Sequence, residues 1–361
     1  MKSPIMLATI SVGGKAGGLE KNLIYLCNEL ISSGEKVILL TFDLANAETF
    51  YGLNSAVIWI KVGTTQPHTK MSILQKIRLV RSIRRNIKKY NISKIICFTH
   101  GILSRFLLAK LGLSADIICS ERNSIKMYDF IGQKKWNINF ILLVFAKKIT
   151  VQFDEYRYDY PIWLRHKIRT LNNPIFHQTK NTDLSSKTIL AVGRLATQKR
   201  FDLLIRAFAN VIREWPDWHL QIIGEGHLKT ALLDLITELG ITSSVTITPS
   251  THSPQRYYET SSIFVISSQW EGFPNALAEA LSYGMLGVGF THTAGVNKLI
   301  SNDQNGILAC GPPSTETLSE AITTLLKRSK EWPTMSAQSK KISTTFSSHN
   351  WKNQWKQILD L

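Results

Sequence analysis

The chain has 361 residues, which is long enough for two domains. Its composition, 44% hydrophobic and 9% aromatic residues, excludes an intrinsically disordered protein. No stretch reaches the ~18–20 uninterrupted apolar residues of a membrane span. The N-terminal sequence lacks a signal-peptide pattern, so we expect a cytoplasmic protein. The net charge of +17 lies mostly in residues 1–170, which hold 26 Lys and Arg against 11 Asp and Glu. A fold alone does not require this excess, so an anionic partner is expected there.

Short apolar runs alternate with amphipathic segments from the N-terminus onward. The first half contains predicted strands at Ile5–Ile10, Lys36–Phe42, Lys94–Phe98 and Asp116–Cys119, and a helix at Leu19–Ser33 that Gly34 ends. A basic segment, Lys76–Lys89, carries an apolar stripe at helical spacing, namely Ile77, Val80, Ile83 and Ile87. Such a helix can lie on anionic lipid. We expect the stripe to pack into its own domain and the cations to face the anionic partner.

The second half repeats the same order of strand, glycine turn, helix and strand. Its predicted strands are Thr188–Val192, His219–Ile223, Ser244–Thr248 and Ile263–Ser267, with a helix at Phe201–Glu214. This alternation predicts an α/β fold of two Rossmann-like, doubly wound parallel-sheet domains that face a central cleft. We place an N-terminal domain at residues 1–172, a C-terminal domain at 173–345, and a C-terminal helix at 346–361 that packs back toward the N-terminal domain.

Four cysteines are scattered through apolar surroundings: Cys27, Cys97, Cys119 and Cys310. Their spacing matches neither a disulfide framework nor a zinc site. We expect four buried, reduced thiols and no bound metal.

Two carboxylates flank the start of a predicted helix in the second half. Glu271 and Gly272 lie in a loop after an apolar strand, Pro274 suits a first helical turn, and Glu279 follows within the helix. The amides of Asn275, Ala276 and Leu277 would then form a helix N-terminus suited to a phosphate. Spacing alone leaves this site and an ordinary acidic helix start equally open.

Two cations follow the first strand of the second half. Arg194 comes directly after Val192-Gly193, and Lys199 precedes the next helix. Two cations at the mouth of a sheet can neutralise a pyrophosphate leaving group. By themselves they would better suit a solvated loop, and this interpretation weakens only because a helix start suited to a phosphate is predicted in the same half. Gly224-Glu225-Gly226 predicts a further tight turn near this edge.

A glycine-rich loop, Gly13–Gly18, joins the first strand to the first helix. It departs from the dinucleotide-binding pattern because Lys15 stands where the second glycine belongs. Asp43 nevertheless ends the second strand, where dehydrogenases keep a ribose-binding acid. An NAD-dependent dehydrogenase therefore stays open as an alternative.

Taken together, these residues resemble a family-4 glycosyltransferase of the GT-B architecture. The resemblance rests on Gly193-Arg194 with Lys199, on Glu271 and Glu279 with seven residues between them, on Gly17-Gly18-Leu19-Glu20, and on Asn172-Asn173-Pro174. It covers essentially the whole chain. The sequence is similar to bacterial transferases that build polysaccharides and lipid-linked oligosaccharides.

The resemblance implies a donor site for a UDP-sugar. Glu271 would contact the sugar hydroxyls, Glu279 the ribose, and Arg194 and Lys199 the diphosphate. Other donor-binding residues would be Gly17, Gly18, Gly272, Phe273, Pro274, Asn275, Ala276 and Leu277. Transfer would retain the anomeric configuration and would require neither a metal nor another cofactor. A sugar-nucleotide epimerase of the same architecture is the second alternative.

The acceptor site is expected in the first half. Many relatives carry a histidine where this chain has Arg122, within Ser120-Glu121-Arg122-Asn123-Ser124. A guanidinium does not act as a general base. Glu121, Arg122 and Asn123 are therefore interpreted as binding residues, with Glu121 orienting the attacking hydroxyl; a local Glu121–Arg122 ion pair is the structural alternative. His100, at a strand end, is a further acceptor-site candidate or a structural histidine.

The expected partners are a UDP-sugar, a glycan acceptor on a lipid carrier, and an anionic membrane surface that the basic N-terminal domain binds. We expect peripheral association with the inner face of the cytoplasmic membrane. Nucleic acid is not expected, because the basic residues are not interleaved with stacking aromatics.

Overall fold

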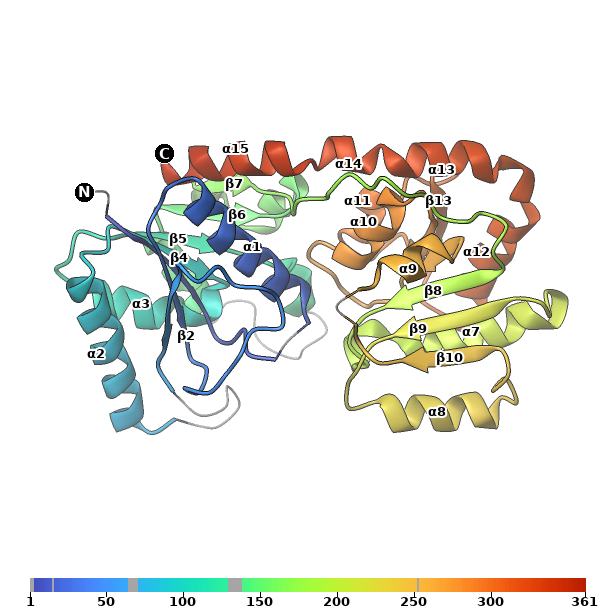
Figure 1. The fold of residues 1–361 in the computed structure, drawn as a ribbon, viewed down its shortest axis with the longest axis horizontal. Coiled ribbons are helices and arrows are strands. Elements are labelled where there is room, and N and C mark those ends of the chain that lie inside the picture. Colours follow the sequence, from blue (N-terminus) through green and yellow to red (C-terminus); the bar gives the residue numbers. More distant parts are fainter. Residues whose placement is uncertain (1–2, 15, 64–70, 129–137, 252) are drawn as a thin grey trace. The chain divides into compact units, whose positions relative to one another are not determined.

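The computed structural model describes residues 3–14, 16–63, 71–128, 138–251 and 253–361. The chain divides into two compact units: residues 1–172 with 352–361, and residues 173–351. Each unit contains its own parallel sheet, as Figure 1 shows. The predicted Rossmann-like, doubly wound sheets are confirmed.

The first unit is built on a seven-stranded sheet of order β3-β2-β1-β4-β5-β6-β7. Every neighbouring pair of strands is parallel. The strands are β1 (Ile5–Thr9), β2 (Val37–Thr41), β3 (Ile58–Lys61), β4 (Lys94–Phe98), β5 (Asp116–Ser120), β6 (Lys148–Val151) and β7 (Ile168–Thr170). The order reverses between β1 and β4, so their carboxyl ends bound the switch point, where ligands of such sheets bind.

Helices cover both faces of this sheet. They are α1 (Gly18–Ser32), α2 (Ile73–Lys89), η1 (His100–Ile102), α3 (Leu103–Lys110), η2 (Ile125–Met127), α5 (Ile138–Ile141), η3 (Leu142–Phe145), η4 (Asp154–Asp159) and α6 (Ile162–Arg165). The crossover through α1 steps toward β3, whereas the later crossovers step toward β7. Because parallel crossovers are right-handed, α1 lies on one face and the later helices on the other.

The end of α15 (Ser348–Leu359) belongs to the first unit from Lys352 onward. Lys352 forms an ion pair with Glu29 of α1 at 2.8 Å. Lys148 donates hydrogen bonds of 2.8 Å to the Ile358 carbonyl and to Asp360. These contacts hold the end of the chain against the first sheet.

The second unit has a six-stranded parallel sheet of order β10-β9-β8-β11-β12-β13. Its strands are β8 (Thr188–Val192), β9 (His219–Ile223), β10 (Val245–Thr248), β11 (Ile263–Val265), β12 (Leu286–Phe290) and β13 (Gly306–Ala309). Its helices are η5 (Thr197–Lys199), α7 (Phe201–Glu214), α8 (Lys229–Glu238), α9 (Gln255–Glu259), α10 (Asn275–Ser282), α11 (Val296–Leu299), α12 (Thr315–Lys327), η6 (Ser329–Glu331), α13 (Trp332–Lys340) and α14 (Ile342–Thr345). The order reverses between β8 and β11, which are the strands that precede the predicted donor residues.

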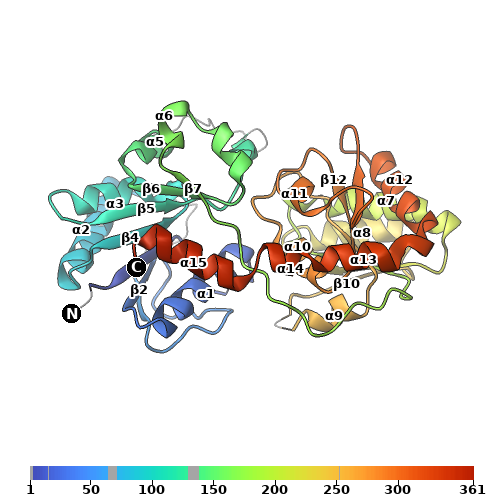
Figure 2. The same cartoon turned by 90° about the horizontal axis from the view of Figure 1, so that it is seen from above.

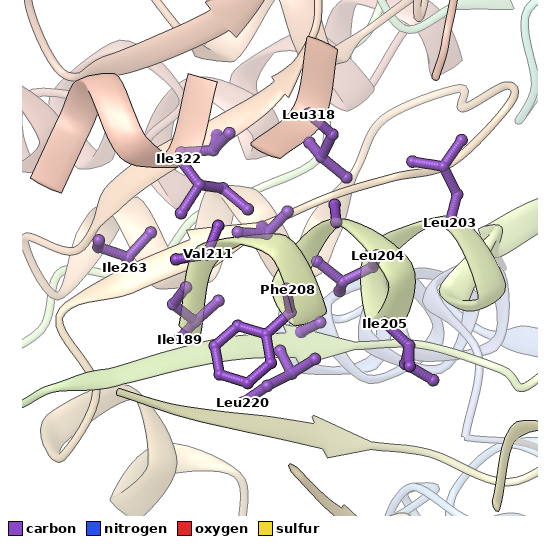
Figure 3. Packing of buried hydrophobic residues seen from close by; sticks show 14 of the residues in the cluster. Ile189, Leu203, Leu204, Ile205, Phe208, Val211, Leu220, Ile263, Leu318 and Ile322 are labelled. Atoms are coloured by element: carbon purple, nitrogen blue, oxygen red, sulfur yellow. The ribbon is translucent and has the colours of Figure 1, made fainter. Parts of the chain in front are cut away.

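The core of the second unit forms where α7 and α12 pack against each other and against the sheet. Figure 3 shows Phe208 of α7 directed at Leu220, and Leu318 and Ile322 of α12 beside the same helix. Figure 2 shows α7 and α12 side by side. Burial of this apolar face, at ~25 cal/mol per Å², anchors α7 and with it the loop that precedes it.

Two expectations about burial were wrong. Cys27, Cys97 and Cys119 are buried, but Cys310 is exposed because it follows the last strand, β13, at its end. In α2, Ile83 and Ile87 are buried as predicted, but Ile77 is exposed and Leu79 is buried instead. Only the second half of that helix places the predicted stripe against the unit.

In the part of the chain that the structure describes, no helix combines the length and apolar composition needed to cross a membrane.

We expect Phe208→Ala to lower the free energy of unfolding of the second unit by about 3–5 kcal/mol, because it leaves a cavity in this core. Urea unfolding followed by tryptophan fluorescence measures the change, since Trp218 lies in the same cluster. Leu233→Ala on the exposed side of α8 is the control and should change stability by less than about 1 kcal/mol. Equal losses for the two variants would contradict this account of the core.

Candidate active site

The predicted cations and carboxylates of the second unit lie at the switch point of its sheet. Arg194 follows β8 and is exposed, and Lys199 ends η5. Glu271 follows β11 in the neighbouring position. Because β8 and β11 are parallel and adjacent, their carboxyl ends deliver these side chains to the same edge of the sheet.

Glycines position the Arg194 loop by close backbone contact. The Gly193 amide donates to the Ile223 carbonyl at 3.0 Å, and the Leu195 amide donates to Glu225 at 2.8 Å. A Cβ at Gly224 would lie 1.9 Å from the Gly193 carbonyl oxygen. The predicted tight turn at Gly224–Gly226 therefore packs directly against the loop that carries Arg194. Only a glycine at position 224 allows the two backbones to lie this close.

Lys199 and Glu271 form an ion pair, with Nζ 2.6 Å from Oε1. The Lys199 side chain is 19% exposed and the Glu271 side chain 9%. Gln198 links the loop before Lys199 to the loop before Glu271. Its side-chain amide donates to the Trp270 carbonyl at 2.8 Å, and its backbone carbonyl accepts from the Gln269 amide at 2.9 Å. A cation and a carboxylate are thus held side by side at the edge of the sheet.

The N-terminus of α10 lies directly after Glu271. The Ala278 amide makes the first bond within the helix, to the Pro274 carbonyl at 3.0 Å. The amides of Ala276 and Leu277 therefore have no acceptor within the helix, and the helix dipole adds positive potential there. Pro274 is the N-cap and not a member of the first turn as predicted, because its backbone is not helical.

The side chains of several predicted donor residues are buried or bonded within the second unit. The Phe273 ring is buried and packs edge-on against Phe346, with ring centroids 5.5 Å apart. Leu277 is fully buried. Asn275 accepts a side-chain hydrogen bond of 2.8 Å from Asn173, at the start of the second unit. Gly272 is buried within the same loop.

Glu279 is held by a residue that the sequence did not single out. The Tyr258 hydroxyl donates to Glu279 Oε2 at 3.2 Å. The Tyr258 ring stacks on Tyr283, with centroids 5.3 Å apart. Nothing in the sequence signals this contact, because Tyr258 lies 21 residues before Glu279 and on another helix. The carboxylate is half-buried and fixed on the side of α10 that faces Tyr258.

In the first unit, Gly17 and Gly18 begin α1 at the carboxyl end of β1. Gly17 is the N-cap, with extended backbone, and its carbonyl accepts from Lys21 at 3.0 Å. The glycine loop thus leads into a second helix N-terminus, which also suits an anion. Lys15 lies outside the described residues.

Asp43 holds this glycine loop in place. Its carboxylate accepts hydrogen bonds from the Ser11 hydroxyl at 2.5 Å and from the Val12 and Gly13 amides at 3.0 and 3.3 Å. Asp43 is buried and these donors occupy its oxygens, so the ribose-binding role of the dehydrogenase alternative does not fit.

His100 and Glu121 form a buried pair at the other side of the first switch point. His100 Nδ1 lies 2.9 Å from both carboxylate oxygens of Glu121, and the His100 amide donates to Oε1 at 2.7 Å. His100 Nε2 contacts the Tyr128 hydroxyl, and Cys119 Sγ donates to Glu121 at 3.2 Å. The sequence did not reveal Tyr128, which lies 28 residues from His100. Glu121 therefore holds His100 in place, and its role toward an attacking hydroxyl stays a prediction.

Charge coupling sets the protonation of this pair. Burial alone would lower the pKa of His100, but the charge and hydrogen bond of Glu121 outweigh it and raise the pKa above 6.5. Burial alone would raise the pKa of Glu121, but the charge of His100 and the hydrogen bonds from His100 and Cys119 lower it. Between pH 4.5 and 6.5, the ordinary pKa values of glutamate and histidine, Glu121 is therefore deprotonated and His100 is protonated.

Arg122 and Asn123 differ in their exposure. Arg122 is buried, and its guanidinium lies over the Phe98 ring, 4.8 Å from the centroid. Burial lowers the pKa of Arg122 to about 10, against the opposing effect of the Glu121 charge, so the side chain stays cationic at neutral pH. Asn123 is exposed. Glu121 forms its ion pair with His100 and not with Arg122, as the structural alternative would have it.

Within the described ranges, no group of three or more His, Cys, Asp and Glu side chains could hold a metal ion.

Residues 172–342 match the model of a family described as "Glycosyl transferases group 1". An uncharacterized glycosyltransferase of Haemophilus influenzae is 26% identical over 96% of this chain and 97% of its own length. The chain is a glycosyltransferase of the GT-B fold. The dehydrogenase alternative is therefore wrong.

Two further relatives of this glycosyltransferase have named activities. The amylovoran biosynthesis glycosyltransferase AmsD of Erwinia amylovora is 25% identical over 82% of this chain and 84% of its own length. The N-acetylgalactosamine-N,N'-diacetylbacillosaminyl-diphospho-undecaprenol 4-alpha-N-acetylgalactosaminyltransferase of Campylobacter jejuni is 39% identical over 35% of this chain and 33% of its own.

Among solved structures, Anabaena HepE in complex with UDP and glucose has a TM-score of 0.81 and 18% identity. The similarity covers 99% of the glycosyltransferase described here and all of HepE. At this identity the likeness establishes the fold alone.

We expect the His100–Glu121 pair to make the stability of the first unit depend on pH. A raised histidine pKa stabilises the fold below pH 6.5, and this contribution is lost as the pH rises through the raised value. A lowered glutamate pKa stabilises above pH 4.5, and this contribution is lost as the pH falls through the lowered value. Stability from the pair is thus greatest between pH 4.5 and 6.5, which urea unfolding across pH measures.

Glu121→Gln should remove the increase in the pKa of His100. Burial then acts on His100 without an opposing carboxylate, so its pKa should fall below 6.5, and NMR titration of the imidazole measures this value. His219 and His292, whose pKa values burial lowers, are controls within the same molecule and should not change. An unchanged His100 pKa in the variant would contradict the coupling.

Proposed function

We propose that this protein is a retaining, family-4 glycosyltransferase that moves a hexose or N-acetylhexosamine from a UDP-sugar to a hydroxyl of a glycan acceptor. The acceptor is carried on a lipid, and the product is a bacterial surface polysaccharide or related glycan. The observation that carries the proposal is the Lys199–Glu271 pair at the switch point of the second sheet, directly before the N-terminus of α10.

The diphosphate of the donor is assigned to the cations and the helix N-terminus. Arg194 is exposed, and Lys199 retains 19% exposure despite its ion pair. The Ala276 and Leu277 amides add hydrogen-bond donors, and Gly17 and Gly18 provide similar donors in the first unit. As UDP departs, negative charge develops on its diphosphate, and fixed cations and amides stabilise that charge. Because the cations supply this stabilisation, the proposed reaction requires neither a metal nor another cofactor.

The two carboxylates are assigned to hydroxyl groups on either side of the diphosphate. Glu271, close to Lys199, would accept hydrogen bonds from the donor sugar, and Glu279, held by Tyr258, from the ribose. A carboxylate fixed by a cation or a tyrosine loses little conformational entropy when it binds a hydroxyl, which favours its role in recognition.

The first unit is assigned to the acceptor. The exposed Asn123 can contact an acceptor directly, whereas buried Arg122, Glu121 and His100 set the charge beneath it. A lipid-linked pyrophosphate acceptor would explain the cation excess of residues 1–170. The names of the Erwinia and Campylobacter relatives support polysaccharide assembly and a lipid-linked acceptor, respectively. The enzyme would then act at the inner face of the cytoplasmic membrane.

The experiment that tests the donor class is a panel of UDP-sugars, namely glucose, galactose and their N-acetyl forms. UDP release is measured with water alone and then with lipid-linked acceptors. Release that increases with an acceptor supports transfer, and NMR of the product should show the anomeric configuration of the donor. Turnover of the sugar nucleotide without an acceptor and without UDP release would favour the epimerase alternative. Failure to use any UDP-sugar would reject the proposal.

We expect substitutions at the ion pair to separate the two donor subsites. Lys199→Met should weaken the binding of UDP even without an attached sugar, because the substitution removes a cation that binds the diphosphate. Glu271→Gln should leave UDP binding intact and lower transfer by about 10²-fold or more, since it acts on the sugar. Isothermal titration with UDP and the rate of UDP release measure the two effects.

Matched controls for this pair are Lys229→Met and Glu214→Gln, which are exposed in the same unit. Neither should change binding or transfer. If Glu271→Gln retains full transfer, or if Lys199→Met binds UDP as tightly as the unaltered enzyme, the assignment of the subsites is wrong.

A further inference from the structure

Exposed apolar side chains concentrate on one face of the first unit. We call α2, α3, α5, η3, η4 and α6 the helical layer; α2 packs on α3, and α3 packs on α5 and η3. Figures 1 and 2 show α2 and α3 side by side. Of the seventeen large apolar side chains that are exposed in the described residues, eleven belong to this layer, and only two belong to the second unit.

One group of these side chains lies on α5, η3 and α6. Ile141, Phe145, Ile162 and Trp163 are each more than half exposed. The segments beneath them are held firmly, because the buried rings of Phe140 and Tyr160 stack 5.7 Å apart. Lys167 adds hydrogen bonds to the Val144 and Ala146 carbonyls at 2.5 and 3.0 Å. The apolar group therefore stands on a fixed support.

The other group lies at the start of α2, where the predicted stripe is exposed. Ile73, Leu74 and Ile77 are 74%, 67% and 42% exposed. The same helix contains seven Lys and Arg and no Asp or Glu. Six of these cations are exposed, and the seventh, Arg84, donates to the Ala109 and Leu111 carbonyls at 2.9 and 2.6 Å.

The sequence around α2 offers the exposed cations no local counter-charge. The chain contains no Asp or Glu between Glu48 and Asp116, although twelve Lys and Arg occur there. Uncompensated cations beside exposed apolar side chains suit a surface that is anionic outside and apolar beneath. Aromatic side chains such as Trp163 and Tyr158 are the kind that settle at the boundary between lipid headgroups and acyl chains.

We propose that the helical layer is a docking face for an anionic lipid bilayer. The cations of α2 bind the headgroups, while the side chains of α5, η3 and α6 enter the outer part of the acyl region. A second copy of this chain fits the face poorly, because it would bring the same cations against one another. The inference rests on the proposed function in one respect: a lipid-linked acceptor requires the enzyme to work at a membrane.

Flotation with vesicles tests the docking face. The full chain should bind vesicles of equal phosphatidylcholine and phosphatidylglycerol, and high salt or phosphatidylcholine alone should weaken binding. Arg81→Gln with Arg85→Gln should lower the partitioning of the protein onto these vesicles about 30-fold, because each surface cation contributes ~1 kcal/mol to membrane binding. Ile162→Ser with Trp163→Ser should lower it by about tenfold or more.

Matched controls lie on the second unit. Lys229→Gln with Lys330→Gln removes the same charge, and Leu233→Ser removes an exposed apolar side chain; neither should change partitioning. Arg81→Lys with Arg85→Lys should restore binding, which shows that charge and not folding is responsible. Equal losses for layer and control variants, or no binding of the anionic vesicles, would overturn the proposal. The proposal would also be overturned if sedimentation showed a dimer of the unaltered chain that dissociates when Ile162 and Trp163 are substituted.

The same variants keep the two proposals distinguishable. None of the substituted residues lies in the donor site, so UDP release with water or a soluble acceptor should match the unaltered enzyme. If vesicle binding follows the layer variants but no UDP-sugar is consumed, the docking face stands and the proposed function fails. If UDP-sugar is consumed without vesicle binding, the docking face fails alone.

Discussion

The parallel arrangement of both sheets is the constraint on which the rest of the structure depends. Parallel strands bring all their carboxyl ends to one edge, so loops far apart in the chain meet there. Arg194 and Glu271 are separated by more than seventy residues, yet they follow adjacent strands, β8 and β11. In the first unit the same rule places the glycine loop after β1 and His100 after β4, on either side of a second switch point.

Two ion pairs lie at these edges, and their environments differ. His100 and Glu121 are buried together, and Tyr128 and Cys119 complete their hydrogen bonds. Such a pair costs desolvation energy and holds its groups in one arrangement. Lys199 and Glu271 pair as closely, but Lys199 stays partly exposed. The first pair is suited to maintain a charge state, and the second to exchange its partner for a polar ligand.

The faces of the first unit also differ from one another. On one side, α1 is in contact with the end of the chain through the Lys352–Glu29 ion pair. On the other side, the helical layer keeps six cations of α2 and eleven large apolar side chains exposed. Net charge alone could not distinguish these faces, because it gives no position for a charge on the surface. The right-handed crossovers decide which helices share a side.

Local periodicity and glycine punctuation determined most of the fold. Thr188–Val192, Phe201–Glu214 and His219–Ile223 were predicted to the residue, because apolar spacing and the adjacent glycine or proline define their ends. The same motifs indicated Arg194, Lys199, Glu271 and Glu279, since each lies just after a strand or at a helix start. Only the tertiary structure decided what these side chains contact.

The contacts of Tyr258 with Glu279, and of Tyr128 with His100, join separate elements across 21 and 28 residues and leave no local pattern. The Glu121–Arg122 ion pair, which the sequence left open as the structural alternative, illustrates the limit: these neighbours diverge, with Glu121 bonded to His100 and Arg122 lying over Phe98. Exposure is decided in the same way. Ile77 has the spacing of a core residue but is 42% exposed, because the position of a helix on its sheet is a tertiary property.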